Sequence, residues 1–178
     1  MTDSARCANV LGALALVITD QSAAAMAAGT DLSASAASAV SALAEFLDQP
    51  TLDELRKVVG LTPSGVVRLV DRLADAGLVS RGAGSDGRSR AIILTERGRA
   101  VAGELRIARL ASLQGMLTGL TDDEQETLHT LLGRVMGTIV EQKSGGAWIC
   151  RQCDLAACER AAGHCPAQVA AKKKYNLS

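Results

Sequence analysis

Residues 62–73 carry the sequence TPSGVVRLVDRL, and this run predicts a helix with a defined beginning. Thr62 can cap the helix with its hydroxyl group, and Pro63 suits the first helical position because no intrahelical bond needs its missing N–H. Apolar side chains then recur at helical spacing, which predicts one buried stripe. The stripe consists of Val66, Leu69, Val70 and Leu73. The opposite face of the helix is left for solvent or a partner.

A shorter helix is predicted just before this one. Thr51 and Glu54 form a capping-box pattern, in which each side chain bonds to the backbone N–H of the other residue. Gly60 can adopt the positive φ of a tight turn and predicts the end of this helix. Its expected buried side chains are Leu52, Leu55 and Val59. Two helices joined by a short glycine-containing turn are typical of a helix-turn-helix.

A β-hairpin is predicted directly after the second helix. Residues 78–81 and 91–94 have strand-like composition and flank a glycine-containing loop at 82–90. Longer helices are predicted on both sides, at 4–28, 35–47, 95–117 and 121–142. The predicted fold is therefore mostly α: a winged helix-turn-helix with a three-helix core, a β-hairpin wing, and long helices at both ends.

Composition narrows the possible functions. The 19 basic and 19 acidic residues cancel, so whole-chain charge gives no support to nucleic-acid binding. Residues 51–100 nevertheless hold nine Arg or Lys against six Asp or Glu, which is a modest local surplus. No apolar stretch is expected to be long enough to cross a bilayer, so we expect a cytoplasmic protein without membrane contact. No nucleophile–base pair or phosphate-binding loop is recognisable, which predicts that the chain is not an enzyme.

The outer face of the 62–73 helix can enter a major groove. Backbone N–H groups at its beginning, with Thr62 and Ser64, can meet phosphate. Arg68 and Arg72 can reach phosphate or the O6/N7 edge of guanine. Gly65 and Val67 complete the face predicted to contact double-stranded DNA.

The tip of the hairpin offers a second contact. Arg88 and Arg90 can insert into a narrow minor groove, where arginine senses the shape of DNA. Asp86 can orient Arg88 through a charge-assisted hydrogen bond before DNA arrives.

These segments together resemble the MarR family of winged-helix regulators. The resemblance rests on residues 62–73, 77–79, 86–88 and 94–98, which follow one another in the family's order. It implies a homodimer formed by the first and last helices, Arg68 in the major groove, Arg88 at the wing tip, a repressor role, and a small-molecule effector. Dimer symmetry implies a pseudo-palindromic operator with half-sites about one helical turn apart. Val67 departs from the family, because many members carry a hydroxyl residue there.

Four cysteines near the C-terminus predict a metal site. Cys150, Cys153, Cys158 and Cys165 have the spacing Cys-x2-Cys-x4-Cys-x6-Cys. Such thiolates suit a tetrahedral Zn²⁺ site, with His164 as an alternative fourth ligand, and an iron–sulfur cluster is the competing interpretation. Free or redox-paired thiols are the third alternative. Cys7 stands alone in the first helix and is expected to be a small buried side chain.

The expected organisation has four parts. They are an N-terminal dimerisation region (1–49), a DNA-binding winged helix-turn-helix (50–100), helices that complete the dimer region (101–143), and a metal-binding extension with a polar tail (144–178). The expected function is a homodimeric, sequence-specific transcriptional regulator that responds to a small-molecule, metal or redox signal. The alternative is a metal-binding winged-helix module that contacts proteins and does not read DNA.

Overall fold

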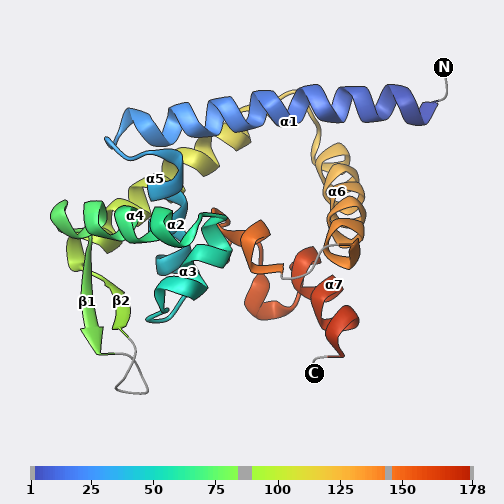
Figure 1. Ribbon diagram of the computed structural model, residues 1–178. Coiled ribbons are helices and arrows are strands. Elements are labelled where there is room, and N and C mark those ends of the chain that lie inside the picture. Colours follow the sequence, from blue (N-terminus) through green and yellow to red (C-terminus); the bar gives the residue numbers. More distant parts are fainter. Residues whose placement is uncertain (1–2, 84–89, 143–145, 177–178) are drawn as a thin grey trace.

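The computed structural model describes residues 3–83, 90–142 and 146–176 (Figure 1). The helices are α1 (Asp3–Ala28), α2 (Ala34–Glu45), α3 (Leu52–Val59), α4 (Pro63–Asp75), α5 (Glu96–Gly115), α6 (Asp122–Gln142) and α7 (Pro166–Tyr175). An antiparallel sheet of β1 (Val79–Ala83) and β2 (Arg90–Leu94) forms the hairpin, and two short 3-10 helices, η1 (Gly146–Cys150) and η2 (Arg160–Ala162), lie before α7. The predicted winged helix-turn-helix fold is confirmed.

The helix boundaries follow the expected local chemistry. The Thr51 N–H donates to Glu54 Oε2 at 2.8 Å, and the Glu54 N–H donates to Thr51 Oγ1 at 3.3 Å, so the capping box is complete. Gly60 ends α3 in the left-handed region, with φ of 72°. Thr62 then caps α4 by accepting the Gly65 N–H at 3.1 Å. The turn between α3 and α4 is therefore fixed by hydrogen bonds at both of its ends.

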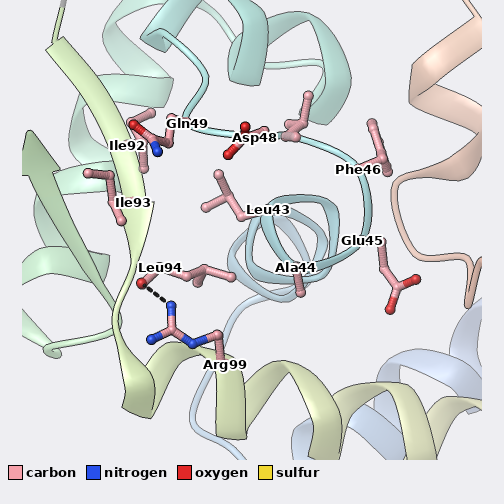
Figure 2. A pocket seen from close by; sticks show the side chains of 11 residues that line it. Leu43, Ala44, Glu45, Phe46, Asp48, Gln49, Ile92, Ile93, Leu94 and Arg99 are labelled. Atoms are coloured by element: carbon pink, nitrogen blue, oxygen red, sulfur yellow. Dashed lines mark hydrogen bonds between the residues drawn. The ribbon is translucent and has the colours of Figure 1, made fainter. Parts of the chain in front are cut away.

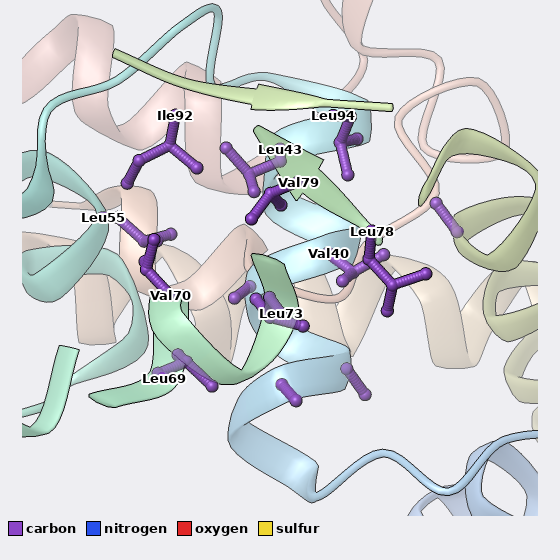
Figure 3. Close-up of a cluster of buried hydrophobic side chains, with 14 of the residues drawn as sticks. Val40, Leu43, Leu55, Leu69, Val70, Leu73, Leu78, Val79, Ile92 and Leu94 are labelled. Atoms are coloured by element: carbon purple, nitrogen blue, oxygen red, sulfur yellow. The ribbon is translucent and has the colours of Figure 1, made fainter. Parts of the chain in front are cut away.

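The main core forms where α2, α4 and the hairpin meet (Figure 3). All four residues of the predicted α4 stripe are buried, and so is Leu55 of α3. They pack with Val40, Leu43, Leu78, Val79, Ile92 and Leu94. One expectation for α3 was wrong: Val58 is buried, whereas Leu52 and Val59 are only partly buried. Val58 lies outside the main core, against which Leu52 and Val59 pack, and α3 also contacts η1 of the C-terminal segment, which a local pattern does not reveal.

Helix α1 differs from the sequence expectation in two respects. It is long and apolar enough to cross a lipid bilayer, so the expectation that no stretch has that length was wrong. The alanines between the large apolar residues keep the mean hydropathy of this helix high. Residues 3–17 are all exposed, including Cys7, which is therefore not a buried side chain in this chain. Figure 1 shows that the first half of α1 extends past the end of α5, on which its second half packs.

The C-terminal segment is more ordered than a polar tail. Residues 166–175 form α7, which packs along α6 and buries Ala167 and Ala170. Lys174 Nζ donates to the Val140 carbonyl of α6 at 3.0 Å. The segment before α7 is short and irregular, and it includes the chain's single tryptophan, Trp148, in η1. The expected tail is thus a helix that covers one face of α6.

The beginning of α5 depends on close backbone contact at Gly98. A Cβ atom there would lie 2.0 Å from the Leu78 carbonyl oxygen, which cannot move without displacing the hairpin. We expect Gly98→Ala to lower the free energy of unfolding by about 1–3 kcal/mol, as overpacking does. Urea denaturation followed by circular dichroism measures the change.

The matched control is Gly103→Ala in the same helix, where no atom lies within 4 Å of the added Cβ. This change should raise stability by up to about 1 kcal/mol, because alanine favours a helix over glycine. Equal effects of the two substitutions would contradict the close packing of α5 on Leu78.

Candidate functional site

Burial of one face of α4 turns its other face outward. Ser64, Val67, Arg68 and Arg72 are exposed, and Gly65 is half-buried. Val67 keeps 40% of its surface accessible although it is apolar. Four of the five groove-facing residues predicted on this helix thus lie on one accessible surface. We call Ser64, Gly65, Val67, Arg68 and Arg72 the outer face of α4.

The two arginines of the outer face are exposed. Within the described ranges, neither Arg68 nor Arg72 has an ion pair, whereas Arg56 lies 2.8 Å from the Asp53 carboxylate. Since residues four apart on a helix share one face, the two guanidinium groups form one positive patch. Arginine carries five N–H donors and recognises phosphates or guanine edges through pairs of them. The patch is chemically suited to a polyanion.

The beginning of α4 adds to this patch. Thr62 is occupied as the cap, and Ser64 Oγ lies 3.5 Å from Thr62 Oγ1 while remaining exposed. The first turn of a helix carries a partial positive charge and backbone N–H groups without intrahelical partners. Phosphate can therefore bind beside Ser64, whereas Thr62 acts first as a structural cap.

Asp71 of α4 has a partner within the protein. Its carboxylate pairs with the Arg81 guanidinium of β1 and so joins α4 to the base of the hairpin. Arg97 and Arg99, which contribute to the local positive surplus, donate to the carbonyls of Ala76 and Leu94, each at 2.9 Å. These arginines therefore stabilise the winged helix itself. No local pattern predicts such pairings, because the partners belong to different elements.

The hairpin has a defined base. Val79 pairs with Leu94 and Ala83 with Arg90, in regular antiparallel register. Asp86 and Arg88 lie outside the described residues, and Arg90 is described only through its backbone position at the start of β2. The proposed roles of Asp86, Arg88 and Arg90 stay predictions.

A cavity of about 430 Å³ lies between the end of α2 and β2 (Figure 2). Leu43, Ile92 and Leu94 give it an apolar wall, and Arg99 lies at its edge. Because Ile92 and Leu94 belong to β2, a molecule bound here would contact the strand that leads to the wing. The cavity is a candidate effector site.

The four C-terminal cysteines gather around a second cavity, of about 300 Å³, between α5, α6, η1 and α7. Their thiols approach as two pairs, Cys150 with Cys153 and Cys158 with Cys165. The Cys153 thiol, followed by the Arg160 guanidinium, lowers the pKa of Cys150 to about 6, and the same contact raises that of Cys153. Burial and the neighbouring Cys165 thiol raise the pKa of Cys158 to about 12.

His164 takes no part in this cluster. Its Nδ1 lies 2.6 Å from Glu159 Oε2, and 66% of its side chain is exposed, whereas Cys165 lines the cavity and is 2% exposed. Cys165 is therefore the better placed of the two candidate ligands. Among the described residues, no three Cys, His, Asp or Glu side chains already surround one common point as ligands of a single ion would.

Comparison with known proteins supports the winged helix-turn-helix fold. Residues 30–89 match the model of the MarR family. A MarR family protein of Bacillus stearothermophilus has the same fold, with a TM-score of 0.70 at 22% identity, over 78% of this chain and 98% of that one. A MarR family protein of Mycobacterium tuberculosis, solved with p-aminosalicylic acid, matches with a TM-score of 0.58 at 25% identity, over 72% and 96%. A probable transcriptional regulator of Pseudomonas aeruginosa matches at 28% identity, with a TM-score of 0.54, over 70% and 95%.

An exposed helix backed by a buried stripe and followed by a two-stranded hairpin defines a winged helix-turn-helix protein. The resemblance to MarR-family transcriptional regulators is confirmed, by the family model over residues 30–89 and by the fold over about three quarters of the chain.

The capping role of Thr62 can be separated from any contact with DNA. Thr62→Ala should lower the free energy of unfolding by about 1 kcal/mol, because the Gly65 N–H loses its acceptor. Thr62→Ser should retain most of that stability. Ser64→Ala should change it by less than about 0.5 kcal/mol, as expected of an exposed residue that caps nothing. Thermal unfolding without DNA measures all three, and a large loss for Ser64→Ala would contradict the assignment of Thr62 as the cap.

Proposed function

We propose that the chain is a homodimeric, sequence-specific DNA-binding transcriptional regulator that acts as a repressor in the cytoplasm. The observation that carries the proposal is the pair Arg68 and Arg72, which are exposed on the outer face of α4 and form no ion pair with any residue that the structure describes. Nearby arginines form contacts within the protein, so these two are the cations of α4 that are free to meet phosphate or bases.

In the proposed complex, α4 lies in the major groove. Ser64 and the first turn of α4 bind phosphate, Arg68 and Arg72 reach phosphate or guanine, and Val67 contacts a thymine methyl group. Gly65 lets the backbone approach closely. Arg88 and Arg90 enter the flanking minor groove, and Asp86 orients Arg88.

Loss of either arginine should weaken DNA binding without unfolding the protein. We expect Arg68→Ala or Arg72→Ala to cost about 1–3 kcal/mol of binding free energy for the operator. A residue that contacts phosphate should also reduce the salt dependence of binding, whereas one that reads a base should relax specificity at that position. Fluorescence anisotropy against a selected operator at several salt concentrations measures both effects.

Lys172→Ala is the control, since it removes an exposed cation from α7, far along the chain from α4. It should leave DNA affinity unchanged. The alternative function, a metal-binding module that contacts only proteins, predicts no salt-dependent binding to any duplex from a random-sequence library. That result would refute the proposed function.

Exposed apolar stripes on two helices support the homodimer. On α1, Val10, Leu14 and Val17 are 60%, 44% and 47% exposed, and on α6, Leu131 and Val135 are 51% and 43% exposed. Members of each set recur at helical spacing, so each helix presents one apolar face. Soluble chains rarely leave such faces uncovered. We propose that a second copy covers both, which places two α4 helices about one turn of DNA apart on a pseudo-palindrome.

A charge placed in the α6 stripe should separate the subunits. Val135→Glu is expected to give a monomer, because a carboxylate would be buried without a partner. Val169→Glu on α7 is the matched control, since Val169 is 54% exposed but lies outside the stripes. Light scattering after size-exclusion chromatography measures the mass. A wild-type monomer, or recovery of the protein with lipid membranes through α1, would contradict the proposed dimer.

The cavity between α2 and β2 supports a small-molecule signal. Its apolar wall suits a small apolar molecule, and a relative of this chain was solved with p-aminosalicylic acid. We propose that such a molecule binds beside β2 and moves the wing.

A further inference from the structure

The cysteine-containing segment has a small apolar core. Its buried residues, Val140 of α6 with Cys150, Cys165, Ala167 and Ala170, form a cluster separate from the main core, and Phe46, Met136 and Ile149 pack against it while partly exposed. Two of the five buried side chains are thiols and two are single methyl groups. Short units with so little apolar surface usually require disulfides or a bound metal. All four cysteines of the segment are free, so no disulfide supplies that stability.

The backbone places the thiols on one side of a turn and at a helix N-terminus, two positions that are common for metal ligands. The Cys153 N–H donates to the Cys150 carbonyl at 2.9 Å, which closes a turn and brings both thiols to one side. Cys165 is the N-cap residue of α7, and the partial positive charge at the N-terminus of a helix favours a thiolate. Both pairs of thiols border the same cavity.

Two arginines leave positive charge beside these thiols. Arg109 of α5 lines the cavity, and its Nε is buried without a hydrogen-bond partner among the described residues. Arg160 Nη1 lies 3.6 Å from Cys150 Sγ. Both guanidinium groups are only partly buried, but their charge lies beside the thiols, so this arrangement favours thiolates in the cavity.

We propose that Cys150, Cys153, Cys158 and Cys165 bind a metal centre through four thiolates, and that this centre fastens α6 and α7 to the winged helix. Binding releases the protons that these thiols still carry. Four thiolates around Zn²⁺, or around the doubly positive core of a [2Fe–2S] cluster, carry two negative charges, which Arg109 and Arg160 offset. A [2Fe–2S] cluster takes two thiolates on each iron atom, whereas a single Zn²⁺ takes all four.

The segment that would hold the metal is bonded to the winged helix. Gln152 Nε2 donates to Ser38 Oγ of α2 at 2.8 Å, and the Leu155 N–H donates to Glu45 Oε2 at 2.9 Å. Asp154 pairs with Arg106 of α5 at 3.1 Å. On its other side, Pro166 of α7 packs closely on Gly133 of α6. A metal centre would therefore link the α6–α7 pair to α2 and α5 through a few residues.

Metal analysis tests the site directly. Full-length protein is purified without oxygen, dialysed against a weak chelator, and assayed for zinc, iron, sulfide and visible absorption. One zinc per chain with no colour identifies a zinc site, and two irons and two sulfides per chain with visible absorption identify a cluster. Either result supports the four-thiolate centre. Metal below about one tenth of an equivalent, with no uptake from added Zn²⁺ or from reconstitution with iron and sulfide, overturns it.

Variants then separate the site from general thiol effects. Cys153→Ser should lose most of the metal, whereas Cys7→Ser, which removes the exposed thiol of α1, should keep all of it. Hydrogen exchange should become faster in residues 146–175 and in α6 after metal removal, and it should stay unchanged in α4. If Cys153→Ser fails to fold, reversible removal and return of metal to the wild type gives the same comparison. Exchange that does not respond to metal would overturn the fastening role.

A regulatory consequence rests on the proposed function. If α6 positions the partner subunit, loss of the metal should lower operator affinity by about fivefold or more, a typical coupling between two sites. Metal content and hydrogen exchange are measured without DNA, so failure of DNA binding would leave the result on the metal centre intact.

Discussion

The burial of one stripe of α4 fixes the orientation of this helix and so determines which of its side chains face outward. Val66, Leu69, Val70 and Leu73 pack against α2 and the hairpin, so the helix cannot rotate about its axis without exposing leucine or valine. Burying a side chain of this size contributes about 1.5–3 kcal/mol. That constraint keeps Ser64, Arg68 and Arg72 on the outside. The exposure of these polar side chains therefore follows from the way the core packs.

Local sequence patterns predicted the parts of the fold that local chemistry determines. Thr51, Gly60 and Thr62 each act within a few residues of their own position, so their roles as caps and turn could be deduced from spacing. The wing's base and the buried stripe followed from periodicity. Local patterns cannot identify the partner of Asp71, because that partner, Arg81, belongs to β1. Asp71 looks like any polar residue on an amphipathic helix until the hairpin is placed beside it.

In the C-terminal region, too, local spacing predicted some features, whereas contacts between distant elements could not be predicted. Cysteine spacing predicted a cluster, and the four thiols do border one cavity. Spacing could not show that Arg109, more than forty residues before the last cysteine, closes the same cavity, or that Gln152 and Leu155 are bonded to α2. Nor did the three lysines near the end suggest a helix, because the residues that hold α7 on α6 are small alanines with weak periodicity. Contacts between distant elements needed the structure.

The scarcity of aromatic residues has a practical consequence for the protein in solution. Trp148 is the single tryptophan of the chain, and it lies in η1, two residues before Cys150. The winged helix and the long helices contain none. Intrinsic tryptophan emission therefore comes from one point, next to the cysteines, and is silent about the rest of the molecule. The chain carries a built-in fluorophore where its architecture departs most from a simple winged helix.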